Sequence, residues 1–596
     1  MARIWPLVCC HHLVLTRSIL FCFVLAASVS GQFVGNPQAI PRTGHPPVVF
    51  LNGFEVDCGS ASFQKAFGIA DQVLQANGRA SLFFNNCSIS GRPSIEKLGA
   101  AFGSFLAGLT YDDGQPVGSV DVVGYSMGGL IVRSYLSGKQ EAQGVFVPPP
   151  AILIGKVIFI ATPHFGSPVA GLAFGSNVQT DELSSGSNFL MDLNTWNQTH
   201  DDLRGIDAIG IAGSGGTGLA TTPGFDDGLV PLSSASLRFY LPGRTRILPL
   251  CHVASPGLLT LTGFCLPNAK GVARVTGAND DNARIIISFL NGSADWQSIG
   301  TGIEQNSLLQ NGGGILVRSR TANDVKIEPS SVNAAPASGA AKKLNMSYSE
   351  IAYTDLISAG VVNLTVNAGA QSFAESVFAQ GGGAQAIVAK KGPVVNAVIP
   401  AAALVFPLVV APRMIVSIYG TGLDQAVVTL NGAAVSVIYG SDVQINAVLP
   451  GSAGVGLNQF VVQNAGGSQT VNVWTEAAFP AVFALSQAGS SAAAVNAGTG
   501  KVVSSLNPMH AGEYVELFLT GLGATESRGG FDYARIQPLV SVGGVDCPVS
   551  YAGAAPGFAG LDQINCRIPG GLGAQGAAVV VRSGLRSSPV STLAVE

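Results

Sequence analysis

Between Pro46 and about Leu290 the chain alternates between two hydrophobic patterns. Short runs of adjacent apolar residues predict buried β-strands, and apolar residues recurring every three or four positions predict helices between several of them. Strands that alternate with helices are typical of a mainly parallel sheet covered on both faces. The expected helices are Ser62–Gln75, Ile95–Leu106 and Asp280–Leu290. The expected strands are Pro47–Leu51, Ala80–Phe84, Ser119–Val123, Lys156–Ile160, Ile206–Ile211 and Thr245–Leu248.

The helical period nearly disappears after Trp296, where Gly, Ser and Ala turns separate short apolar runs. The runs Ile315–Arg318, Val361–Val366 and Ala386–Ala389 predict a small β-domain over residues 298–392. A partly ordered linker is the alternative, because Ser330–Ala341 consists mostly of small and polar residues.

The C-terminal third contains an internal repeat. Val428–Pro450 and Val540–Pro569 both run as strand, Asn/Gly turn, strand with Tyr, loop, Gln-Ile-Asn, strand and Pro. A repeated β unit of this size predicts two tandem Ig-like sandwiches, over residues 393–478 and 479–596. The two Gln-Ile-Asn triplets either bind a ligand or fix a loop to its own backbone.

Composition and the amino terminus narrow the class of protein. A chain of 596 residues is too long for one hydrophobic core, which predicts a multidomain protein. Charged residues make up 11% and the formal net charge is −4, a balance that excludes a nucleic-acid-binding footprint. Arg3 and Arg17 precede the apolar run Ile19–Ala27 and the small residues Ser28–Gly31. This order predicts a secretory signal over residues 1–31 and a secreted or cell-surface protein, with a retained membrane anchor as the alternative.

Six of the nine cysteines follow this signal, and they fall into sequence-local pairs. An even number fits three disulfides formed in an oxidising compartment, and free buried thiols are the alternative. The expected pairs are Cys58 with Cys87, Cys251 with Cys265, and Cys547 with Cys566.

One segment carries a candidate nucleophile. Ser119–Leu136 reads SVDVVGYSMGGLIVRSYL, a strand, a tight turn and a helical pattern. A serine on such a strained turn is held exposed, where a base can activate it. Gly124 and Gly128 make this nucleophile elbow sterically possible, so Ser126 is the expected nucleophile.

A serine nucleophile needs a histidine base and an orienting carboxylate. On a sheet of this kind the chain order is Ser, then Asp or Glu, then His. Only His252 and His510 follow a plausible acid, and His510 falls within the repeats, so His252 is the expected base. The segment FDDGLVPL offers Asp226 and Asp227 as acids, and spacing alone does not separate the two.

The oxyanion that forms during acyl transfer needs hydrogen-bond donors in place beforehand. Backbone amides of Phe54, after the first strand, and of Met127, after the nucleophile, are the expected pair. The insertion Val169–Thr222 is richer in Gly, Ser and apolar residues than a sheet connection needs. It is either a lid over the serine or an ordinary packed helix. The side chains that would line an acyl site are Leu172, Phe174, Phe189, Leu190, Leu193 and Trp196.

Four ordered motifs together resemble secreted bacterial lipases and related α/β-hydrolases. They are GYSMGG at Gly124–Gly129, ATPHFGSP at Ala161–Pro168, DGLV at Asp227–Val230, and the late His252. The resemblance covers about residues 46–292 and implies an α/β-hydrolase domain over 32–297. It also implies that Asp227, before Gly-Leu-Val, is the triad acid. The chain has Asn52-Gly53 where these lipases usually have His-Gly, and Ala254 where they have a calcium-binding aspartate, so no metal is expected.

Residues 394–596 also resemble the Ig-like C-terminal module of secreted proteins from soil acidobacteria such as Solibacter. The shared residues are Tyr551–Gly553, Ala555–Phe558, Gln563–Asn565 and Pro569. This second resemblance implies an accessory role, such as contact with a cell surface or matrix.

The sequence therefore predicts a secreted carboxylic ester hydrolase, with a lipid or other ester as substrate and no cofactor. An acyltransferase with the same triad is one alternative. A surface-binding protein with a vestigial hydrolase domain is the other.

Overall fold

The computed structural model describes residues 32–596 with gaps. The residues outside the description are 1–31, 35–38, 56–61, 90, 198–199, 201, 219–224, 241–242, 255–263, 304–311, 321–325, 338, 370, 391, 403–408, 486–489, 573–575 and 585. The predicted signal falls on residues outside it.

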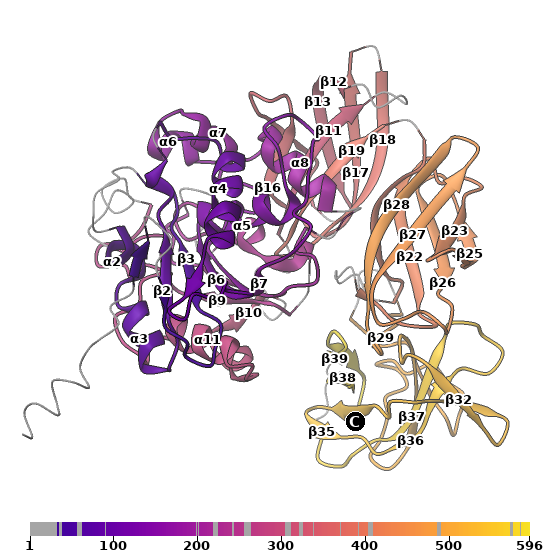
Figure 1. Cartoon of the computed structure of the whole chain (residues 1–596). Helices are drawn as coiled ribbons and strands as arrows, with labels where there is room; N and C mark the ends of the chain where they lie inside the picture. The colour runs from indigo at the N-terminus through magenta and orange to yellow at the C-terminus, as the bar shows by residue number, and fades with distance from the viewer. Residues whose placement is uncertain are drawn as a thin grey trace, which may run out of the picture.

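The N-terminal α/β region, residues 32–302, is built on one eight-stranded sheet (Figure 1). Its first seven strands in spatial order pair in parallel, and the edge strand β10 pairs antiparallel with β9. This confirms the predicted mainly parallel sheet. The spatial order is β1 (Gln32–Val34), β4 (Ser81–Phe84), β3 (Val48–Leu51), β6 (Val120–Tyr125), β7 (Ile154–Ile160), β8 (Asp207–Gly213), β9 (Thr245–Leu248) and β10 (Thr301–Gly302).

Helices cover both faces of this sheet because successive strand residues point to opposite sides. Val49 and Leu51 belong to one core, with α4 (Ile95–Ala107), α5 (Met127–Ser137) and α8 (Asn188–Asn197). Val48 and Phe50 belong to the other, with α2 (Ser62–Phe67), α3 (Ala70–Ala76) and α11 (Asp281–Leu290). The connections contain α6 (Ala170–Phe174), α7 (Val178–Leu183), α9 (Leu232–Ala235) and three short 3₁₀ turns, η1 (Asn86–Ser88), η2 (Leu237–Phe239) and η3 (Asp295–Ser298).

The single helix predicted over Ser62–Gln75 is wrong, because the segment forms two helices that break at Gly68. Gly68 has φ +63°, a left-handed conformation that glycine adopts without a steric penalty. A Cβ at this position would lie 2.1 Å from the carbonyl oxygen of Val275. The close approach of that chain segment therefore ends α2, and the hydrophobic period carries no sign of it.

The middle β region, residues 313–389, consists of two sheets with a shared apolar core. The segment Ser330–Ala341, which suggested a linker, contributes an ordered strand over most of its length. One sheet contains β11 (Gly313–Arg320), β12 (Lys326–Ile327), β15 (Asn345–Met346), β16 (Ala352–Ile357) and β19 (Ala384–Ala389). The other contains β13 (Pro329–Pro336), β14 (Lys342–Lys343), β17 (Gly360–Ala368) and β18 (Gln371–Ala379).

This middle region packs directly into the α/β region. Leu316, Ile351 and Ala384 belong to the same buried cluster as the residues of α4, α5 and α8. The guanidinium of Arg318 on β11 lies 2.7 Å from the carboxylate of Asp192 on α8, and both side chains are buried. The middle region is therefore part of the packing that supports the N-terminal sheet.

Two β-sandwiches follow, the first over residues 394–475 and the second over residues 481–593 (Figure 1). Each is a pair of sheets, mostly antiparallel, that enclose one apolar core. The first contains β20 (Val394–Pro400), β21 (Val409–Val410), β22 (Ile415–Thr421), β23 (Val427–Leu430), β24 (Ala433–Ala434), β25 (Ser436–Gly440), β26 (Gln444–Val448), β27 (Gly456–Asn464) and β28 (Gly467–Thr475). The second contains β29 (Ala481–Val482), β30 (Ala494–Asn496), β31 (Tyr514–Thr520), β32 (Thr525–Arg528), β33 (Phe531–Ala534), β34 (Leu539–Val542), β35 (Val545–Asp546), β36 (Val549–Ala554), β37 (Asp562–Arg567), β38 (Ala577–Ser583), β39 (Arg586–Ser587) and β40 (Ser591–Leu593).

The sequence repeat corresponds to the same structure in both sandwiches. Tyr439 pairs with Asn446 beside an irregularity in β25, and Tyr551 pairs with Asn565 beside the same irregularity in β36. In each triplet the Gln amide donates to the side-chain oxygen of the Asn two residues later, at 2.8 Å. These amides are bonded within their own strands, which favours the structural interpretation of the triplets.

Two of the three expected disulfides are present, Cys251–Cys265 and Cys547–Cys566. Cys58 of the third expected pair lies outside the described residues. Disulfides of this kind fit an oxidising compartment. In the described part of the chain, none of the helices has both the length and the apolar character of a membrane span.

Candidate active site

Ser126 sits on a strained turn between β6 and α5. Its backbone has φ 54° and ψ −125°, an unfavourable conformation for a residue with a Cβ. The turn is also tightly packed against its neighbours. A Cβ on Gly124 would lie 2.9 Å from the backbone of Gly129, and one on Gly128 would lie 2.4 Å from the carbonyl oxygen of Leu51. Both positions therefore need glycine, as the sequence predicts for a nucleophile elbow.

The structure brings together Ser126, directly after β6, Asp227, in the connection that follows β8, and His252, in the connection that follows β9. The Nε2 of His252 lies 2.9 Å from the Oγ of Ser126, and its Nδ1 lies 2.8 Å from the Oδ2 of Asp227. The three side chains are buried, with Ser126 the most exposed at 8%. A hydroxyl, an imidazole and a carboxylate in this order can transfer the serine proton to the histidine during nucleophilic attack.

The two adjacent aspartates, which spacing left open, have different partners. The Oδ1 of Asp227 accepts hydrogen bonds from the amides of Leu229 and Val230, at 3.0 and 2.8 Å, which leaves its Oδ2 to face His252. The Oδ1 of Asp226 accepts from the amide of Gly228 at 2.8 Å. Of the two, Asp227 is therefore the one in position to orient His252.

The loop after β3 lies against the serine. A Cβ on Gly53 would lie 2.8 Å from the Cβ of Ser126, so the glycine allows the backbone to approach the nucleophile. The carbonyl of Gly53 accepts a hydrogen bond from the side-chain amide of Asn86 at 2.9 Å, which holds the loop in place. Phe54 follows directly, and Met127 is the first residue of α5, where an amide has no acceptor within the helix. The two residues expected to donate to the oxyanion are therefore both next to Ser126, Met127 in the chain and Phe54 through the adjacent loop.

Tyr125 is a contact of the site that sequence analysis missed. Its hydroxyl donates to the backbone carbonyl of His252 at 2.6 Å, and the two rings lie 5.2 Å apart. Burial and the nearby Asp227 carboxylate raise the pKa of Tyr125 well above its ordinary value, so the hydroxyl stays a donor. No local pattern could indicate this bond, because the two residues are 127 positions apart.

A buried network behind α5 was also missed. Arg133 lies 2.6 Å from Asp202 and donates to the side-chain oxygen of Asn194 at 3.0 Å. The amide of Asn194 in turn donates to the carbonyl of His164 at 2.7 Å. Burial, with the Arg133 charge, lowers the pKa of His164 well below its ordinary value, which keeps this histidine neutral. His164 is thus a buried residue of the core. It precedes both candidate acids in the chain, so the expected order Ser, acid, His had not selected it as the base.

The predicted insertion contains a packed helix, one of the two alternatives that the sequence left open. Phe189, Leu190 and Leu193 on α8 are buried in the core of the α/β region and do not form a lid. On α6, in contrast, Leu172 is 80% exposed. The ring of Phe174 lies 5.1 Å from that of Phe54, so α6 is beside the loop that contacts Ser126.

Among the described residues, no three His, Cys, Asp or Glu side chains gather as a metal site.

No family model and no curated protein matches this chain. Among solved structures, the chain is similar to phospholipase PlaB from Legionella pneumophila in complex with thio-NAD, at 13% identity and a TM-score of 0.43, covering 59% of this chain and 94% of that one. It is similar to the lipase BlEst2 from Bacillus licheniformis in its propeptide form, at 16% identity and a TM-score of 0.30, covering 74% and 95%. It is also similar to lipase 1 from Pelosinus fermentans, at 12% identity and a TM-score of 0.21, covering 30% and 74%.

Proposed function

We propose that this protein is a carboxylic ester hydrolase with Ser126 as nucleophile, His252 as base and Asp227 as orienting acid. The observation that carries the proposal is the row of hydrogen bonds from Ser126 through His252 to Asp227. It is supported by the strained backbone of Ser126, because such strain concentrates at functional sites.

The reaction follows from the positions of the atoms. The Nε2 of His252 accepts the proton of Ser126, and the Oγ attacks the ester carbonyl carbon. The amides of Met127 and Phe54 donate to the carbonyl oxygen as it becomes negative. His252 then gives its proton to the leaving alkoxide, which departs as the alcohol and leaves an acyl-enzyme. His252 next removes a proton from a water molecule, which attacks the acyl carbon. The bond from this carbon to the Oγ then breaks, His252 returns the proton to the Oγ, and the carboxylic acid leaves.

The surroundings of the site favour esters with an apolar acyl group. Phe54 and Phe174 present their rings beside the oxyanion loop, and the neighbouring α6 carries the exposed Leu172. Val169 and Phe174 also pack with Leu229 and Val230, which follow the acid. An apolar acyl chain laid along these side chains would exclude water from the reacting carbonyl.

We further propose that the protein acts outside the cytoplasm. Its two disulfides support this, because such bonds persist in oxidising compartments. The two C-terminal sandwiches would then supply contact with a cell surface or matrix, separate from the ester site.

The direct test is hydrolysis of p-nitrophenyl acyl esters by purified variants. His252→Ala should lower kcat/KM by about 10⁴-fold or more, because the serine loses its base. The matched control is His510→Ala, an exposed histidine paired with Glu513 in the second sandwich, which should retain the wild-type rate. Full activity in His252→Ala would refute the proposal. A series of acyl chain lengths, compared by kcat/KM, then identifies the preferred substrate class.

A further inference from the structure

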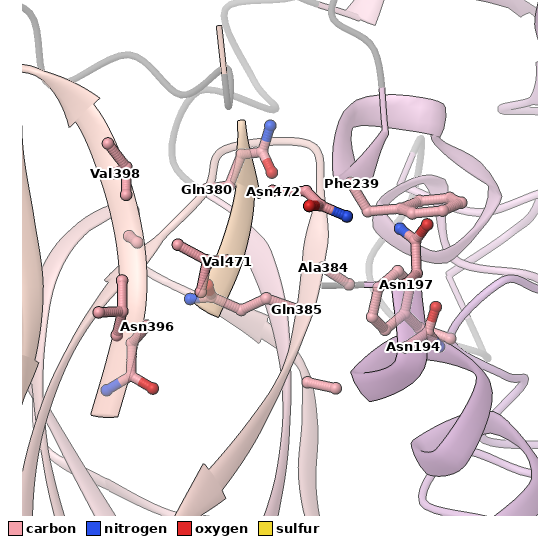
Figure 2. A pocket seen from close by; sticks show the side chains of 14 residues that line it. Asn194, Asn197, Phe239, Gln380, Ala384, Gln385, Asn396, Val398, Val471 and Asn472 are labelled. Carbon is pink, nitrogen blue, oxygen red and sulfur yellow. The ribbon is translucent and has the colours of Figure 1, made fainter. Parts of the chain in front are cut away.

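A cavity of about 50 Å³ lies where the α/β region, the middle β region and the first sandwich meet (Figure 2). Phe165 and Phe239 form its wall on the α/β side. Gln380 and Ala384 come from the middle region, and Val471 and its neighbours from the first sandwich. Three parts of the chain therefore build this cavity, and none of the residues proposed for ester hydrolysis lines it.

The lining is amphipathic and uncharged. Six residues with carboxamide side chains line the cavity among apolar residues, and none of the fourteen lining residues is ionisable. The carboxamides are Asn194, Asn197, Gln380, Gln385, Asn396 and Asn472.

Several of these carboxamides are already engaged with the protein. The side-chain amide of Asn194 donates to the carbonyl of His164, and the Asn194 side-chain oxygen accepts from Arg133. The Nε2 of Gln385 donates to the carbonyl of Phe378 at 2.6 Å. The amide of Asn396 donates to the Glu375 side chain at 3.1 Å. These groups hold the walls in fixed positions.

Two carbonyl oxygens differ from the rest. The Oε1 of Gln380 and the Oδ1 of Asn472 are buried and have no hydrogen-bond partner within the described part of the chain. Gln380 is only 1% exposed, and its Nε2 donates to the carbonyl of Arg238 at 3.4 Å, which leaves the oxygen to accept. In Figure 2 the Asn472 side chain extends across the cavity toward Asn197 and Phe239. Buried polar atoms are nearly always paired, so two unpaired acceptors in one cavity point to an occupant.

From this lining we propose that the junction binds a small neutral polyol of about the size of glycerol. Two unpaired acceptors require an occupant that donates hydrogen bonds, which hydroxyl groups do. The uncharged lining would stabilise neither an anion nor a cation. The carbon–hydrogen faces of a polyol pack on Phe239, Val398 and Val471. A volume of about 50 Å³ holds about three to five water-sized groups, since each needs roughly 10–15 Å³, and this sets the upper size limit near glycerol.

Binding is tested by isothermal titration calorimetry of the full chain with glycerol, and with xylose as a probe above the size limit. Glycerol should show saturable binding at one site per chain, and xylose should show none. Gln380→Leu and Asn472→Leu should each weaken glycerol binding about tenfold, the effect of losing one hydrogen bond. Gln463→Leu, an exposed carboxamide on β27, is the matched control and should bind as the wild type does. Ser126→Ala should also bind unchanged, which separates this site from ester hydrolysis.

Each other outcome overturns the proposal. Absence of saturable binding of glycerol would mean that the cavity holds water alone. Equal binding by wild type, Gln380→Leu and Asn472→Leu would mean that the polyol acts at other surfaces, as polyols do when they stabilise proteins by exclusion. Thermal melting of each variant without ligand verifies folding. If Gln380→Leu does not fold, Asn472→Leu decides the outcome alone, because its position on β28 is half-buried.

Discussion

At the scale of single residues, the imidazole of His252 is held from two directions. Asp227 contacts its Nδ1 at 2.8 Å, and the Tyr125 hydroxyl contacts its backbone carbonyl at 2.6 Å. The ring itself is buried, so it has little room for other orientations. This double restraint keeps Nε2 directed at the serine, and each restraint can be removed separately.

Replacing the acid tests which aspartate orients the base. Asp227→Asn should lower kcat by about 10⁴-fold, because an amide favours the wrong histidine tautomer. Asp226→Asn, the matched neighbour, keeps an oxygen that can accept from Gly228 and should retain most of the wild-type kcat. Steady-state kinetics on one p-nitrophenyl ester measures both. If Asp226→Asn loses more kcat than Asp227→Asn does, the acid that orients His252 is Asp226 and not Asp227.

Removing the Tyr125 hydroxyl tests the second restraint. Tyr125→Phe leaves a buried carbonyl unpaired, which costs about 1–3 kcal/mol, and frees the His252 backbone. We expect kcat to fall about tenfold with KM unchanged, because positioning of the base matters in the transition state. Tyr135→Phe, on α5 with its ring against Phe102 of α4, is the control and should leave kcat unaltered. A change in KM alone would mean that Tyr125 serves substrate binding instead.

The residues of the site differ in whether the sequence alone could predict them. Motif and chain order were enough to select Ser126 and His252, because each chemical role demands a particular residue type at a particular strand end. Order did not separate Asp226 from Asp227, since adjacent residues differ only in the direction of their side chains. The Tyr125 contact had no signal at all, because a side-chain bond to a distant carbonyl imposes no spacing on the chain.

At the scale of elements, the strands of the α/β region were predictable because buried parallel strands appear as continuous apolar runs. Helix ends were predicted less well. The break between α2 and α3 arises from the approach of Val275 to Gly68, a tertiary contact that local periodicity does not contain. Ser330–Ala341 shows the opposite case, since partners on β14 and β17 order a segment that has little hydrophobic pattern of its own.

The contact between β11 and α8 carries a stability prediction. Arg318→Met leaves Asp192 without its closest cation in a buried setting, so the free energy of unfolding should fall by about 3 kcal/mol. Arg284→Met, which removes an exposed ion pair with Asp281, should change it by less than about 1 kcal/mol. Urea unfolding followed by circular dichroism measures both. Equal effects would show that the β11–α8 contact adds no more than a surface pair does.

At the scale of the whole molecule, several buried carboxyl groups have raised pKa values. Burial and the neighbouring Glu96 raise the pKa of Glu182 to about 9. Burial raises the pKa of Asp355 to about 6, and that of Glu375 and Asp562 to about 7 each. A raised pKa means that the folded protein holds a proton that the unfolded chain releases. Each group therefore stabilises the fold less as pH rises from its unfolded to its folded pKa.

Glu182 gives this effect a specific test, because it faces Glu96, with Lys139 and Glu141 nearby. Glu182→Gln should keep the hydrogen bond to the Ile95 amide and remove the charge. Its Tm advantage over wild type should therefore grow between pH 5 and pH 9, the window between the unfolded and folded pKa. His164 acts in the opposite direction below its ordinary pKa, but it is common to both proteins and cancels in the comparison.

The control for that measurement is Glu526→Gln, an exposed glutamate on β32 in the second sandwich that should show the same difference from wild type at both pH values. A Tm difference for Glu182→Gln that does not change with pH would contradict the assignment of its raised pKa.

The assembly of the regions was the part least accessible from sequence. Composition separated the α/β region from the β regions, and the repeat predicted two similar sandwiches. That the middle region shares a core with α5 and α8 depends on side chains such as Leu316 and Arg318. The hydrophobic pattern of β11 predicts that this strand is buried, but it does not indicate which other element the strand packs against.

The most direct measurement of the central claim is labelling with a fluorophosphonate probe, followed by mass spectrometry of the modified peptide. The account predicts one covalent adduct, on Ser126, that is absent in Ser126→Ala and slowed about as much as ester hydrolysis in His252→Ala. Labelling of Ser126→Ala to the same extent as wild type, or an adduct on another residue, would contradict it.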